Sequence, residues 1–138
     1  MVGKGSVSDQ GLKAAYVYIV PCDAARDDYA HFEARAGGNI LRLTSVDSMV
    51  CRDDPAVPTP AAGFDTQRGT GTATLNGTPG YELKWKFVDG GPGGANDFVR
   101  ARLTGPGGAV LFRGSAAPPG KFPGSDQPSG NNTAQLLP

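Results

Sequence analysis

A first group of residues that could bind a ligand is a set of four cations on two strand-like runs, residues 81–89 and 97–104. Antiparallel pairing of these runs across a glycine-rich loop places the cations opposite one another, two by two, on the outward face. They are Lys84, Lys86, Arg100 and Arg102. Arginine holds carboxylates and phosphates through paired hydrogen bonds, so the set could bind an anionic cell-envelope or extracellular polysaccharide. Alternatively, carboxylates on neighbouring strands, such as Glu33 or Asp47, neutralise it.

The loop between these runs offers oxygen ligands for a metal ion from Asp89, Asn96 and Asp97. Extracellular Ca²⁺ sites use six or more such oxygens, which makes calcium the candidate metal. The spacing does not match an EF-hand, and a hairpin loop capped by its own aspartates explains the same residues. No other cofactor is indicated, because one histidine and two cysteines exclude a multi-His or Cys-rich metal site.

Two aspartate pairs, Asp27-Asp28 and Asp53-Asp54, each lie near a cysteine. Paired carboxylates could serve as the acid and base of a glycosidase. Adjacent aspartates in loops are also common turn formers that bind their own backbone. The chain contains no Gly-x-Ser-x-Gly nucleophile motif, and its glycine-rich stretches precede strands, so none resembles a phosphate-binding loop. We therefore favour a protein that is not an enzyme, with a small carbohydrate-active hydrolase as the alternative.

Cys22 and Cys51 each end a strand-like run, and both precede polar, Asp-rich loops. We predict a disulfide between them, since a buried free thiol would have little to pack against there. Closing a loop of this length should contribute about 3–4 kcal/mol. Two unrelated thiols in a reducing cell are the alternative. Disulfides persist in oxidising compartments, so the prediction favours an extracellular or cell-surface location.

Composition restricts the class of protein further. Of 138 residues, 21 are glycine and 12 are proline, a mixture that argues against a helical bundle. Thirteen basic and thirteen acidic residues cancel, so no global field favours nucleic acid. No apolar run approaches the roughly 20 residues of a membrane-spanning helix. The length suits one domain, which we expect to be a module of a longer exported chain.

Short strand-like runs separated by turn residues recur along the chain. Their spacing predicts an all-β fold, an antiparallel β-sandwich of about eight short strands. We expect the sandwich core over residues 1–113 and a Pro/Gly-rich tail over 114–138, which returns as a closing strand at 133–137. The hairpin register places Trp85 opposite Ala101, and a large residue facing a small one predicts a buried indole.

Several motifs resemble the post-COAP domain of secreted bacterial proteins. They are Gly69-Thr-Gly-Thr-Ala-Thr-Leu-Asn-Gly, Gly80-Tyr81, Asp89-Gly-Gly-Pro-Gly-Gly and Asp97-Phe-Val-Arg-Ala-Arg, and the resemblance covers residues 4 to 113. It implies a small β-sandwich attached to exported, often multidomain proteins, with no catalytic residues to carry over. The chain departs from the family at the stretch that begins at Ser129, where the family tends to show a Gly-Gly-Asn-Ile-like closing strand.

These observations together predict a non-catalytic accessory or binding module of an exported bacterial protein, flanked by other domains. The expected partner is an anionic polysaccharide, with no nucleic acid and no membrane span. A purely structural spacer that binds no ligand is a further alternative.

Overall fold

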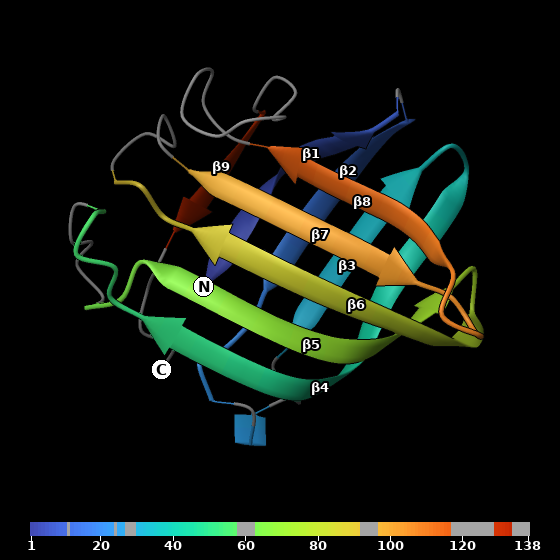
Figure 1. Ribbon diagram of the computed structural model, residues 1–138, viewed down its shortest axis with the longest axis horizontal. Coiled ribbons are helices and arrows are strands. Elements are labelled where there is room, and N and C mark those ends of the chain that lie inside the picture. Colours follow the sequence, from blue (N-terminus) through green and yellow to red (C-terminus); the bar gives the residue numbers. More distant parts are fainter. Residues whose placement is uncertain are drawn as a thin grey trace.

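The computed structural model describes residues 1–10, 12–23, 25–26, 30–57, 63–91, 97–116 and 129–133. These residues form nine strands, shown in Figure 1. The strands are β1 (Val2–Asp9), β2 (Leu12–Ile19), β3 (His31–Ala36), β4 (Asn39–Arg52), β5 (Thr66–Leu75), β6 (Thr78–Val88), β7 (Phe98–Thr104), β8 (Val110–Ala116) and β9 (Ser129–Thr133). The all-β prediction is confirmed. No helix in the described part of the chain is long and apolar enough to cross a membrane.

Eight of these strands close into an antiparallel barrel. Strands β2 to β8 pair in chain order, and β1 completes the ring because it pairs with β2 on one side and meets β8 on the other. The β1–β8 pairing is made at Ser8 and Ser115. Strand β9 occupies the rest of that edge of β1, from Val2–Thr133 to Ser6–Ser129. Each strand from β1 to β8 therefore has neighbours on both edges, and β9 pairs with β1.

The prediction of a sandwich was wrong, and the barrel replaces it. Alternation of apolar and polar residues identifies strands with one buried face, but a sandwich and a barrel share that pattern. What decides between them is the pairing of β1 with β8, which joins the two ends of the chain-ordered sheet. Two register shifts in the β4–β5 ladder, between Leu43 and Ser45 and between Val46 and Ser48, add the local bending that closure requires.

The predicted register of the β6–β7 hairpin is confirmed. Trp85 pairs with Ala101 and Phe87 with Val99. The indole is buried, with 4% of Trp85 exposed. It lies over Gly69 of β5, where a Cβ atom would overlap the indole ring. The close packing of the indole therefore depends on small residues in both neighbouring strands.

The loop end of the barrel carries the connections β2–β3, β4–β5 and β6–β7, of which the last two lie on the left in Figure 1. Its interior is filled by buried side chains. Tyr18 and Phe87 stack there with ring centroids 3.7 Å apart. The fully buried Gln67 donates hydrogen bonds to the carbonyl oxygens of Val20 (2.9 Å) and Pro21 (3.2 Å). The predicted disulfide between Cys22 and Cys51 is present at this end. Ring stacking, buried hydrogen bonds and a covalent bond thus hold the loop end together.

The C-terminal part departs from the predicted boundaries. Strand β8 runs past residue 113 to Ala116, and the strand that pairs with β1 covers Ser129–Thr133. The predicted closing strand, 133–137, shares only Thr133 with it. Residues 134–138 lie outside the described residues.

Candidate functional site

The outward surface of β5 to β8 carries a continuous set of cations. The four predicted ones lie together, because Lys84 pairs with Arg102 and Lys86 with Arg100. The register of the neighbouring strands extends the set, with Arg68 beside Lys86 and Arg113 beside Arg102. We call this surface the basic face; it comprises Arg68, Lys84, Lys86, Arg100, Arg102 and Arg113. The sequence analysis missed the two outer arginines. The Asn76-Gly77 turn alone would have placed Arg68 opposite Trp85, because the β5–β6 register shifts by one residue between Ala73 and Leu75.

Most cations of the basic face form no salt bridge with an acidic residue among the described residues. Lys84 forms a salt bridge of 3.1 Å with Glu82, its neighbour on the same side of β6. The other five side chains of the basic face form no salt bridge with any described residue. The buried Nε of Arg102 likewise has no hydrogen-bond partner within that part of the chain. Like charges on paired strands repel each other, so this arrangement costs stability until an anion approaches.

An aromatic ring offsets part of that repulsion. Phe98 lies with its ring centroid 5.6 Å from Nζ of Lys86 and 5.5 Å from Cζ of Arg100, within the range of cation–π attraction. Burial lowers the pKa of Lys86, and the positive charges of Arg68 and Arg100 lower it further. The negative charges of Asp54 and Asp65 offset part of this effect. The environment of Lys86 therefore disfavours its charge, which a bound anion would stabilise.

The two carboxylates considered as neutralising partners bind elsewhere. Glu33 accepts hydrogen bonds from Nε of Arg35 (2.7 Å) and Nε of Arg42 (2.9 Å) on β3 and β4. Asp47 accepts long hydrogen bonds of 3.4 Å from the hydroxyls of Ser45 and Thr72. The described structure thus assigns neither carboxylate to the basic face.

The pKa of Glu33 provides a test of this charge distribution. The hydrogen bonds from Arg42 and then Arg35 lower the pKa of Glu33 from its ordinary value of 4.5. Because the folded-state pKa is depressed, the contribution to stability is present above about pH 4.5 and lost as the pH falls through the folded-state pKa. We expect Arg42→Gln to raise the pKa of Glu33, measured by ¹³C NMR titration of its carboxyl group. The control Arg52→Gln should leave it unchanged, and an unaltered titration in Arg42→Gln would contradict the assignment.

The predicted calcium ligands are only partly described. Asp89 and Asp97 are both buried, each with 6% exposed. Oδ1 of Asp97 accepts the backbone N–H of Gly90, and Oδ1 of Asp89 accepts that of Gly91, both at 3.0 Å. Asn96 lies outside the described residues. Within the described ranges, no group of three or more His, Cys, Asp or Glu residues could hold a metal ion.

The aspartate pairs considered for hydrolysis are likewise described in part. Asp27 and Asp28 lie outside the described residues. The Oδ1 atom of Asp54 accepts the backbone N–H of Ala56 at 3.1 Å, the pattern of a turn-forming aspartate. The backbone N–H of Asp54 donates to the buried carboxylate of Asp65 at 2.7 Å. Asp54 therefore takes part in organising the β4–β5 loop.

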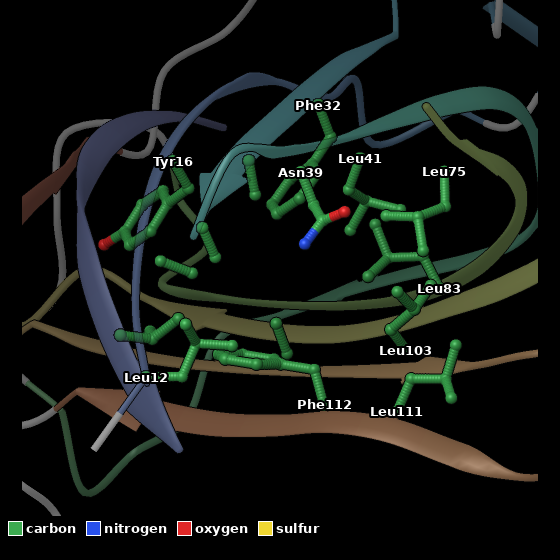
Figure 2. Close-up of a pocket in the computed structure, with 15 residues that line it drawn as sticks. Leu12, Tyr16, Phe32, Asn39, Leu41, Leu75, Leu83, Leu103, Leu111 and Phe112 are labelled. Carbon is green, nitrogen blue, oxygen red and sulfur yellow. The ribbon is translucent and has the colours of Figure 1, made fainter. Parts of the chain in front are cut away.

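The barrel also contains a cavity that the sequence analysis missed. Figure 2 shows it, with a volume of about 280 Å³ and walls of leucine, alanine and aromatic side chains. It lies toward the hairpin end, which carries the connections β1–β2, β3–β4, β5–β6 and β7–β8. Leu12 and Leu111, which are 43% and 50% exposed, and the exposed Asn39 lie at its mouth. Only the assembled barrel brings these residues together, because they come from β2, β8 and β4.

Tyr16 and Phe32 contribute rings to the wall of this cavity. The two rings are nearly parallel, with an interplanar angle of 6° and centroids 6.4 Å apart. Burial raises the pKa of Tyr16, and the negative charge of Asp97 raises it further, so the phenol is neutral at physiological pH. The part of the cavity wall formed by Tyr16 and Phe32 is therefore uncharged.

The fold and these surfaces define a disulfide-bonded antiparallel β-barrel with a basic outer face and an apolar cavity. Comparisons with protein-family models, with curated proteins and with solved structures found no significant match. The resemblance to the post-COAP domain therefore stays a prediction from the sequence.

Proposed function

We propose that the protein is a non-catalytic binding module of an exported bacterial protein and that its basic face binds an anionic extracellular or cell-envelope polysaccharide. The observation that supports this proposal is the set of five cations without a salt bridge to any described residue. The whole chain carries a net charge of zero, so their gathering on β5 to β8 is a local concentration of positive charge. The disulfide suits the oxidising environment of such a polymer.

The geometry of the basic face suits a polymer better than a single small anion. Neighbouring strands lie about 4.8 Å apart, and side chains on one face of a strand recur about every 6.7 Å. The cations therefore form a grid over four adjacent strands. A chain with acidic groups at regular intervals can contact several grid positions at once, which multiplies weak individual contacts.

Binding should depend on acidic groups of the polymer and on unpaired cations of the barrel. We expect the chain to bind polygalacturonate, a carboxylate polymer, or poly(glycerol phosphate), a phosphate polymer. It should not bind neutral dextran. The double variant Lys86→Gln/Arg100→Gln should weaken binding about tenfold or more, because it removes two charge-assisted contacts. Isothermal titration calorimetry measures the affinity of the parent chain and of the double variant for each polymer. Repeating it at high salt should give weaker binding, because salt screens the charges.

The matched control is Arg35→Gln/Arg42→Gln, which removes the same charge from arginines already paired with Glu33. It should bind like the parent chain. Binding to only one acidic polymer would assign the anionic group, carboxylate or phosphate. Equal binding to dextran, retention of affinity in Lys86→Gln/Arg100→Gln, or no binding to either acidic polymer would contradict the proposal, and the last result would favour a structural spacer.

A further inference from the structure

The two halves of the barrel interior are packed differently. At the loop end, Tyr18, Phe87 and Gln67 are fully buried and fill the space between the strands. At the hairpin end, small residues face the interior. The alanines that line the cavity are Ala14, Ala34, Ala36 and Ala101. Protein interiors normally pack to the density of organic crystals, so a cavity of about 280 Å³ is an exception that points to a ligand.

The walls indicate the polarity of that ligand. Leucines from three strands, Leu75, Leu83 and Leu103, line the space in Figure 2 together with the rings of Phe32 and Phe112. Apolar cavities of this kind stay dry and bind apolar molecules. A cavity of about 150 Å³ holds benzene, so the present volume suits a molecule of about a dozen non-hydrogen atoms.

Asn39 adds one polar contact at the mouth. Its Oδ1 accepts a hydrogen bond of 2.8 Å from Nδ2 of Asn76, which fixes the orientation of the Asn39 side-chain amide. The remaining atom, Nδ2 of Asn39, donates to no described residue, and Figure 2 shows the amide projecting into the space between the walls. Asn76 is itself held by its backbone hydrogen bond to the carbonyl of Ile40. The mouth thus presents one amide NH2 group, in a defined orientation, as a hydrogen-bond donor.

We propose that this cavity is a binding site for a small apolar molecule that carries one hydrogen-bond acceptor, with the apolar part inside the barrel and the acceptor on Nδ2 of Asn39. The exposed leucines Leu12 and Leu111 form an apolar rim through which such a molecule enters. The site is separate from the basic face, because it uses inward-facing residues and no charge. Its ligand is independent of any polymer on the outer surface.

Acetophenone is a suitable probe because it is apolar, small and has a single carbonyl acceptor. With the parent chain carrying ¹³C-labelled methyl groups, NMR titration should shift the methyl signals of Leu83 and Leu103 inside the cavity. The signals of the exposed Val17 and Val50 should stay in place. Methyl shifts confined to the exposed valines, or no methyl shifts at saturating acetophenone, would overturn the proposal. This test uses the parent chain, so it does not depend on whether a variant folds.

Variants separate the cavity from the hydrogen bond. Ala34→Leu fills part of the cavity and should abolish binding, while the same change at the exposed Ala15 on β2 should not. Asn39→Ala should weaken acetophenone about fivefold, because one neutral hydrogen bond is lost. It should leave unchanged the affinity for α-methylstyrene, in which a methylene group replaces the carbonyl oxygen. Unchanged binding in Ala34→Leu overturns the site, and equal losses for both probes overturn the role of Asn39.

Discussion

Replacing Phe87 with alanine is expected to lower the free energy of unfolding by about 3–5 kcal/mol. Phe87 is fully buried, and its ring stacks on Tyr18 at 3.7 Å and lies 6.2 Å from Phe32 and 6.3 Å from Trp85. The substitution removes the apolar surface of the ring and leaves a cavity in the tightly packed loop end, which cannot easily collapse because paired strands surround it. Urea unfolding followed by circular dichroism measures the loss.

Two variants keep this prediction testable. Phe87→Leu retains most of the apolar volume and should lose only about 1–2 kcal/mol, so it reports on the site if Phe87→Ala does not fold. Val50→Ala shortens a side chain that is 46% exposed and should change stability by less than about 0.5 kcal/mol. A loss below about 1 kcal/mol in Phe87→Ala would show that this ring is not central to the core.

Removing the disulfide is expected to produce the second large loss of stability. Cys22 and Cys51 are 29 positions apart, and closing a loop of that length restricts the unfolded chain enough to contribute about 3.5 kcal/mol. The double variant Cys22→Ser/Cys51→Ser should therefore unfold at a lower urea concentration, and its Tm should fall by about 10 °C or more. The bond connects the β2–β3 loop, through Cys22, to the end of β4, through Cys51, and both lie at the loop end of the barrel.

Reductant supplies the control for the disulfide prediction. Dithiothreitol should lower the Tm of the parent chain and leave that of Cys22→Ser/Cys51→Ser unchanged. Mass spectrometry after alkylation counts the thiols directly. Free thiols in protein folded under oxidising conditions, or equal stability of the parent and the double variant, would contradict the assigned contribution.

The structural asymmetry of the barrel connects these stability predictions with the proposed cavity. The disulfide, Phe87 and the buried Gln67 all lie at the loop end, whereas the cavity and its exposed rim lie at the hairpin end. The packing and the disulfide of the loop end stabilise the barrel. They offset the packing energy that the cavity removes from the hairpin end. A ligand that fills the hollow end should raise the Tm by binding the folded state alone.

Local features of the structure were predictable because they depend on residues close together in the sequence. The β6–β7 register follows from one glycine-rich loop and from the match of Trp85 with Ala101, and it correctly placed four cations on one face. The disulfide was predicted from the two cysteines of the chain, each at the end of a strand-like run of the sequence. The two outer arginines of the basic face were missed, because placing them requires the registers of β5 with β6 and of β8 with β7.

The sequence by itself determined the all-β class, the β6–β7 hairpin, the disulfide and the outward position of the four predicted cations. Each follows from side-chain alternation, turn chemistry or residue type, which act over short stretches of chain. Only the tertiary structure decided that the sheet closes into a barrel and that a cavity lies within it. Closure depends on β1 meeting β8, and the cavity on alanines from β2, β3 and β7 facing one interior, and both are contacts between segments far apart in the sequence.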